Sequence, residues 1–257
     1  MKKTVKNDLE PKMLDAEAPF AVREAFNQLR TNLIYTITDT ADGAPVFAVT
    51  SSREHTGKST VIANLAISFT QIDKKVLLID ADMRCPVLHD LFGFDNKRQG
   101  LSELLSGISK DVTIRGVRKN LDLITSGRIP PNPSELIACP RFSEYLDAWK
   151  KEYDIIFIDF PPIGIVTDAV VNSKAITGYI FTVRSGRSTA KKINASIEAM
   201  EKLGAKIVGV VLNDHSIKGA VYYRRGDKHG RYVKEGAKYA ESAKLSAEKA
   251  DKDPAKK

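Results

Sequence analysis

The sequence predicts an α/β fold of three layers, in which a mainly parallel β-sheet lies between helices on both faces. Apolar runs such as 76–79 and 155–158 show no polar alternation, which is typical of strands buried on both sides of a parallel sheet. Segments with helical spacing alternate with these runs, so right-handed βαβ crossovers are expected. The 257 residues are enough to bury one large core as a single domain.

The first expected element is an N-terminal helix, whose apolar side chains recur at helical spacing and would pack on the sheet. These side chains are Val22, Phe26, Leu29, Leu33 and Ile37. The expected strands cover residues 46–50, 76–79, 121–124, 153–159, 178–183 and 207–212, and further helices are expected near 101–105, 142–150, 168–175 and 189–203.

A phosphate-binding loop is expected after the strand at 46–50, because a short loop follows it and Gly57–Thr60 then open a helix. In this context the backbone amides and the helix N-terminus attract anions, Lys58 would reach the terminal phosphates, and Ser59 would offer its hydroxyl to Mg²⁺. A lysine followed by a serine is also common at ordinary exposed helix starts. Moreover, Ser52 stands where such loops usually have their first glycine.

Two aspartates, Asp80 and Asp82, follow the apolar run 76–79 directly. Carboxylates at the carboxyl end of such a strand lie where open α/β sheets bind their ligands. In an extended segment, residues two apart point the same way. Two like charges on one side of a buried edge are costly unless a cation or a proton donor offsets them. The pair therefore predicts a metal ion, a substrate hydroxyl, or both.

A third strand, at 153–159, also ends in an aspartate. Asp159 is expected to hold Mg²⁺, through water, as the Walker B carboxylate does. The alternative is a capping aspartate at a strand end before Pro161 and Pro162. Beside the other two motifs, the metal site is the favoured interpretation.

Together these motifs resemble those of the bacterial tyrosine kinases of capsule and exopolysaccharide synthesis, the BY-kinases. Residues 80–84 match the family's Walker A′ element, and residues 23–32 resemble its N-terminal helix. Ser126-Gly127 followed by residues 130–136 resembles the family's connecting loop. Residues 184–186, after the strand that begins at 178, also fit the family pattern. The resemblance covers residues 19–214 and implies a P-loop NTPase scaffold, related to the MinD/ParA partition ATPases, that uses ATP and Mg²⁺.

The resemblance also implies roles for individual residues. Asp82 would orient and deprotonate the incoming tyrosine hydroxyl, Asp80 would support the metal shell, and Lys58 would hold the β- and γ-phosphates. Ser59 and Asp159 would position Mg²⁺. Asn213 resembles the residue that contacts adenine in this superfamily, although a simple turn residue before Asp214 explains it equally well.

Two segments depart from the family pattern. The phosphate-binding loop has Glu54-His55-Thr56 where the family usually has Pro-Gly-Glu, and a residue other than glycine restricts positive φ. The family forms ring-shaped oligomers through a Glu-x-x-Arg-x-x-Arg motif. Here the motif holds Glu24, Asn27 and Arg30, so its middle arginine is missing and the stability of the ring is in doubt. A solvated helix face is the alternative for Glu24 and Arg30.

Residues 218–257 form a basic segment with 12 lysines and arginines, 6 acidic residues and few aliphatic side chains, which predicts a disordered tail. The tail nevertheless holds four of the eight tyrosines: Tyr222, Tyr223, Tyr232 and Tyr239. In the family, neighbouring subunits phosphorylate a C-terminal tyrosine cluster in trans. The alternatives are a solubilising tail with chance tyrosines, and binding to anionic lipid or nucleic acid, although no nucleic-acid motif supports a nucleic-acid partner.

The expected organisation is a flexible segment at 1–18, the kinase domain at 19–217 and the tail at 218–257. No apolar run is long enough for a transmembrane helix, no signal peptide is expected, and Cys85 and Cys139 have no metal-ligand spacing. A cytoplasmic protein is therefore expected. In the family that the motifs resemble, a transmembrane adaptor is either fused or separate, so the resemblance implies recruitment to the inner face of the membrane by a separate adaptor.

Two functional classes follow. The first is an autophosphorylating protein-tyrosine kinase that controls polysaccharide polymerisation or export, with other copies of itself and further protein tyrosines as substrates. The second is a MinD/ParA-like ATPase that acts as a nucleotide-dependent switch and phosphorylates nothing. A degenerate, weakly active homologue is a third possibility, suggested by Glu54-His55-Thr56. The tyrosine-rich tail favours the kinase. The early region of the loop, where partition ATPases usually have a second lysine, holds Ser52 and Arg53 and also favours the kinase.

Overall fold

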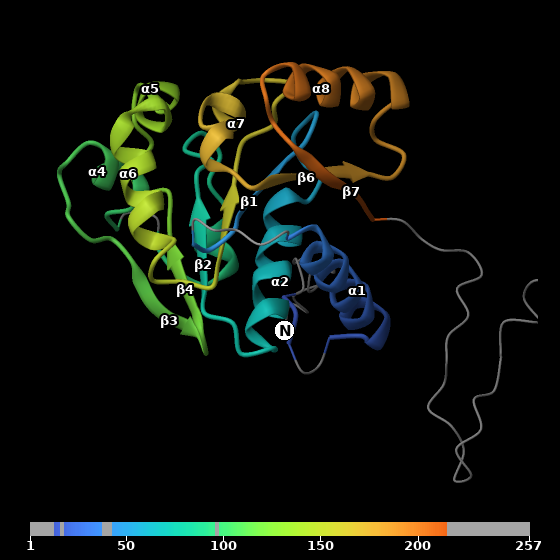
Figure 1. Ribbon diagram of the computed structural model, residues 1–257, viewed down its shortest axis with the longest axis horizontal. Helices are drawn as coiled ribbons and strands as arrows, with labels where there is room; N and C mark the ends of the chain where they lie inside the picture. The colour runs from blue at the N-terminus through green and yellow to red at the C-terminus, as the bar shows by residue number, and fades with distance from the viewer. Residues whose placement is uncertain (1–12, 16–17, 38–42, 96–97, 215–257) are drawn as a thin grey trace, which may run out of the picture. The chain divides into compact units, whose positions relative to one another are not determined.

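A seven-stranded sheet forms the middle layer of the computed structural model, which describes residues 13–15, 18–37, 43–95 and 98–214 (Figure 1). The strand order is β3-β4-β2-β5-β1-β6-β7, and every pair is parallel except β3–β4. The strands are β1 (Val46–Thr50), β2 (Val76–Asp80), β3 (Ile114–Arg118), β4 (Leu121–Ile124), β5 (Ile155–Asp159), β6 (Gly178–Arg184) and β7 (Ile207–Asn213). The predicted three-layer α/β fold is confirmed.

Helices cover both faces of the sheet. They are α1 (Phe20–Thr36), α2 (Lys58–Thr70), α3 (Leu88–Leu91), α4 (Leu101–Leu105), α5 (Pro133–Ala138), α6 (Pro140–Trp149), α7 (Asp168–Val171), a 3₁₀ turn at Ser173–Ala175 and α8 (Ala190–Lys202). Helices α1, α2 and α3 pack on one face, and α4 to α8 pack on the other. None of the helices in the described ranges is long and apolar enough to cross a membrane.

Side-chain alternation along the central strands builds two cores. In β5, Phe157 faces α2, whereas Ile156 and Ile158 face the layer of α4 to α8. All three side chains are fully buried. A strand with apolar residues on both faces is stable only between two helical layers, which explains why the central strands read as continuous apolar runs.

The N-terminal helix differs from its prediction. In α1 only Leu33 is buried, and Val22 is exposed. The helix lies beside α2 (Figure 1), and Leu29 and Leu33 also line a small cavity with residues of β6 and β7. Phe26 and Leu29 are partly buried against the same core, and Ile37 follows the last turn of the helix.

The prediction also missed three short elements. Strand β3 is an antiparallel edge strand with polar, partly exposed residues, so it carries no apolar run. Helix α3 has only four residues, and the connecting loop at 130–136 contains the start of α5. The helix expected at 168–175 is divided into α7 and a 3₁₀ turn.

Candidate nucleotide-binding and catalytic site

The predicted site residues meet at the carboxyl edge of three neighbouring strands, β2, β5 and β1. Asp80, the last residue of β2, is paired in register with Asp159, the last residue of β5. Asp159 is paired on its other side with Val49, and the loop that follows β1 leads into α2 at Lys58. Strand order alone therefore brings the three motifs together.

The loop at 51–57 has the geometry of an anion site. Gly57 caps α2 with a φ of 88°, and an added Cβ there would lie 2.1 Å from the side-chain nitrogen of Asn213. Only glycine fits this position. The Val61 amide donates to the Gly57 carbonyl at 2.9 Å, so the first turn is regular. The first amides of a helix have no partner within it, which leaves those of Lys58, Ser59 and Thr60 to face an anion.

Asp159 is a buried carboxylate whose two oxygens accept no hydrogen bond within the described residues. Burial raises its pKa to about 6, although the charge of Lys58 and the hydroxyl of Ser59 act in the opposite direction. Lys58 is also buried. A buried, unpartnered carboxylate is costly unless a ligand completes it, so Asp159 is suited to a cation.

Asp80 is equally buried but is fully partnered. Its Oδ1 accepts from the Asp82 amide at 3.2 Å, and its Oδ2 accepts from the amides of Val87 and Leu88 at 3.3 and 3.0 Å. Burial, followed by the charge of Asp159, still raises its pKa well above the ordinary value. Asp80 therefore shapes the loop after β2 and the start of α3. Its predicted role in the metal shell is not tested by these contacts.

Asp82 lies in the loop beyond the end of β2 and is almost fully buried. Its Oδ1 accepts from the amides of Arg84 and Cys85 at 3.3 and 3.0 Å. Burial raises its pKa, Lys58 lowers it and the charge of Asp168 raises it. These electrostatic influences indicate that Asp82 lies near both Lys58 and the carboxylate of Asp168.

The structure adds a cluster beside Asp82 that the sequence did not single out. Arg84 donates through Nε to Asp168 at 3.3 Å and through Nη2 to Ser134 at 2.9 Å, and the Ser134 hydroxyl donates to Asp168 at 2.6 Å. Asp168 is buried. Arg84 belongs to the Walker A′ segment and Ser134 to the connecting loop, whereas no sequence pattern marks Asp168, because its partners are 84 and 34 positions away.

Asn213 has a definite structural partner, because its side-chain nitrogen donates to the Thr56 carbonyl at 2.9 Å. It therefore holds the phosphate-binding loop, and its contact with adenine stays a prediction. Thr56 is buried, and its hydroxyl has no hydrogen-bond partner in the described part of the chain.

The structure does not test the predicted oligomer contact or the predicted phosphorylation sites. Arg30 of α1 donates to the Ser68 carbonyl of α2, and burial lowers its pKa while the charge of Glu24 opposes this. Glu24 is exposed. The oligomer contact of these two residues stays a prediction. The four tail tyrosines, the boundary at 217 and most of segment 1–18 lie outside the described residues.

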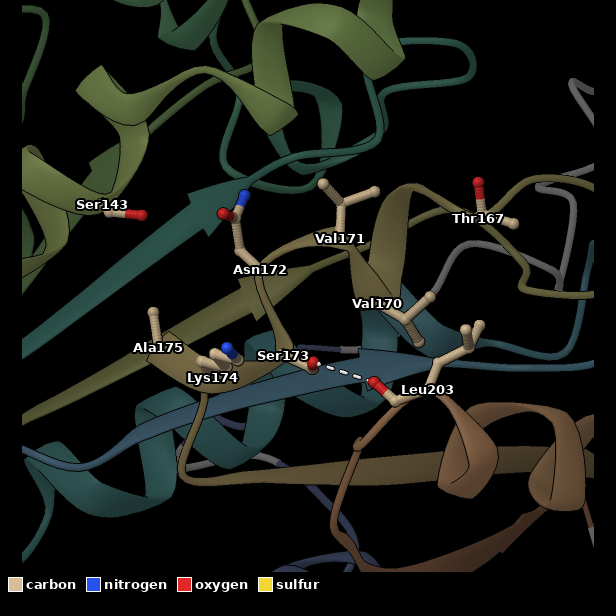
Figure 2. A pocket seen from close by; sticks show the side chains of 9 residues that line it. All are labelled: Ser143, Thr167, Val170, Val171, Asn172, Ser173, Lys174, Ala175 and Leu203. Atoms are coloured by element: carbon tan, nitrogen blue, oxygen red, sulfur yellow. Dashed lines mark hydrogen bonds between the residues drawn. The ribbon is translucent and has the colours of Figure 1, made fainter.

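A separate groove of about 640 Å³ lies where α7 and the 3₁₀ turn meet α6 and the end of α8 (Figure 2). Val171 and Leu203 line it, and the Ser173 hydroxyl donates to the Leu203 carbonyl at 3.2 Å. None of its lining residues is one of the predicted site residues.

The fold and the loop geometry define a nucleotide-binding protein of the P-loop class. The model of the CobQ/CobB/MinD/ParA nucleotide binding domain matches residues 47–225, and the chain belongs to this family. MinD from Pyrococcus horikoshii, solved with Mg-ADP, shares the fold with a TM-score of 0.57 at 24% identity.

Within this class, the nearer relatives are kinases. The tyrosine-protein kinase CpsD of Streptococcus agalactiae is 36% identical over 217 residues, which are 84% of this chain and 91% of the relative. The kinase domain of the Escherichia coli tyrosine kinase ETK has a TM-score of 0.72 at 34% identity, and the match covers 80% of each chain. The chain belongs to the bacterial tyrosine-protein kinases, which favours the kinase over the switch ATPase.

Proposed function

We propose that this kinase transfers the γ-phosphoryl group of ATP, with Mg²⁺, to tyrosine hydroxyls, including those of Tyr222, Tyr223, Tyr232 and Tyr239 on a neighbouring copy. The observation that carries the proposal is the unpartnered, buried carboxylate of Asp159 beside Lys58 and Ser59. This donor set suits Mg²⁺, which keeps several waters and takes one or two carboxylates together with phosphate oxygens. No group of three or more metal-ligating side chains occurs in the described ranges, which is compatible with that sparse shell.

Each residue has a role in this proposal. The amides of Gly57–Thr60 and the Lys58 ammonium bind the phosphates, and Ser59 and Asp159 hold the ion that neutralises charge on them. Asp82 accepts the proton of the tyrosine hydroxyl, whose pKa near 10 keeps it protonated before transfer. Asp80 holds the loop that carries Asp82 in place through its hydrogen bonds to backbone amides.

The resemblance also supports a cellular role. The kinase would act with a separate transmembrane adaptor at the inner face of the membrane and would control capsule or exopolysaccharide polymerisation and export. Each phosphate adds roughly −1.5 to −2 charges, so four would cancel or reverse the positive charge of the tail. Phosphorylation would then convert the tail from a docked to a released state.

Phosphosite mass spectrometry after incubation with Mg-ATP tests the proposal. We expect phosphate on the four tail tyrosines, absent in Lys58→Met and Asp82→Asn and retained in the control Asp90→Asn, whose side chain is 76% exposed. Trans transfer is tested by mixing Lys58→Met with an active chain whose four tail tyrosines are replaced by phenylalanine. Phosphate on the inactive chain supports transfer between copies. ATP hydrolysis without tyrosine modification, even with an adaptor's cytoplasmic segment added, would favour the switch ATPase.

A further inference from the structure

The phosphate-binding loop contains a residue in a backbone conformation that favours glycine. His55 has a φ of 57°, in the left-handed region that side chains with a Cβ adopt at a free-energy cost. The two residues that flank it, Glu54 and Thr56, are not glycine either. Contacts from outside the loop would therefore stabilise this shape.

Two neighbouring strands supply such contacts. Arg184 ends β6 and Asn213 ends β7, and the two residues are register partners. The Arg184 Nη1 donates to the His55 carbonyl at 3.2 Å, and the Asn213 side chain donates to the Thr56 carbonyl at 2.9 Å. Two successive carbonyls of the loop are thus held by two adjacent side chains of the sheet.

Arg184 is itself fixed by the residue that follows β7. Its Nε and Nη2 lie 2.9 and 2.8 Å from the same carboxylate oxygen of Asp214. All three guanidinium nitrogens are therefore used, two on the carboxylate and one on the loop. A lysine offers a single ammonium and could not make both sets of contacts in this geometry.

We propose that Arg184 and Asp214 are positioning residues for the nucleotide: they form a latch that holds the phosphate-binding loop in the left-handed turn at His55. The latch supplies by side-chain contact what a glycine at position 55 would supply by conformational freedom. The inference rests on the proposed function only in that the loop binds ATP. Arg184 acts here through the loop and not through contact with the nucleotide.

The test is rescue by glycine, measured as the affinity of the full chain for a fluorescent ADP analogue with Mg²⁺. Arg184→Ala is expected to weaken binding by about tenfold, because a charge-assisted hydrogen bond to the loop is lost. Asp214→Asn should weaken nucleotide binding several-fold, because the ion pair that fixes the Arg184 side chain is lost. Adding His55→Gly to Arg184→Ala should restore the affinity to within about threefold of the wild type.

The matched control is His55→Ala, which keeps a Cβ at position 55 and should not rescue Arg184→Ala. At saturating ATP the turnover of Arg184→Ala should approach that of the wild type while its KM for ATP rises, because the chemistry is untouched. Unchanged affinity in Arg184→Ala overturns the latch, and so does failure of the glycine rescue, which would mean that Arg184 contacts the nucleotide itself. A wild type that binds no nucleotide would instead overturn the proposed function.

Discussion

The ends of β2 and β5 lie side by side and carry the same residue, yet they are built for different tasks. Asp80 accepts three backbone amides, whereas Asp159 accepts none within the described part of the chain. Both carboxylates are fully buried. The comparison teaches that a satisfied carboxylate organises the chain around it, and that an unsatisfied one beside it retains its binding capacity for a ligand.

The variant Asp159→Asn tests whether the unsatisfied carboxylate holds the ion. We expect tyrosine phosphorylation to fall by at least about a thousandfold, because phosphoryl transfer depends on charge neutralisation by the bound ion. Rates of tail phosphorylation measure this, with Asp90→Asn as the control. An Asp159→Asn chain within tenfold of the wild-type rate would show that the carboxylate does not hold the ion.

The opposite change, Asp80→Ala, should act first on the fold. It leaves the Asp82 amide in the loop after β2 and the Val87 and Leu88 amides at the start of α3 without an acceptor. We expect the free energy of unfolding to fall by about 2–3 kcal/mol. Urea denaturation monitored by circular dichroism measures it. Asp80→Asn keeps one acceptor oxygen and should lose less, so equal stability of the alanine variant and the wild type would contradict the structural role of Asp80.

The raised pKa of Asp159 adds a pH dependence. Its pKa is about 6 in the fold and ordinary in the unfolded chain, so the folded state binds more protons between those values. The protonated carboxyl of Asp159 therefore contributes to the stability of the fold at low pH. This contribution is lost as pH rises from about 4 through 6. Thermal melts of the ligand-free protein should show Asp159→Asn to be more stable than the wild type at pH 7.5, by the order of 1–3 kcal/mol.

Two results would separate the pH dependence due to Asp159 from that due to Asp80. The pKa of Asp80 is also raised, so the Asp159→Asn chain should retain a weaker dependence of the same sign. An advantage of Asp159→Asn that is the same at pH 5 and pH 7.5 would contradict the assignment to Asp159.

Much of the sheet could be predicted because central strands are apolar on both faces, and the motifs could be placed because each one follows such a strand. The polar edge strand β3 gave no such signal. The contacts that position the motifs could not be predicted either, because they join distant residues. Arg184 and His55 are 129 positions apart, and Arg84 and Asp168 are 84 apart. The sequence predicts which residues do chemistry, whereas only the fold shows which residues hold them in place.

The smallest expected effect concerns the cluster at Arg84, which joins the loop after β2 to α5 and α7. Arg84→Ala removes the contacts with Ser134 and Asp168 but leaves the Arg84 amide on Asp82 in place. We therefore expect the phosphorylation rate to fall only several-fold, which corresponds to a rise of about 1 kcal/mol in the activation free energy. Nucleotide affinity should be unchanged. A kcat measured at saturating ATP, beside nucleotide binding, distinguishes this result from the latch, where affinity changes and turnover does not. A loss as large as that of Asp159→Asn would instead place Arg84 in contact with the reacting groups, and the loop after β2 would then carry chemistry as well as shape.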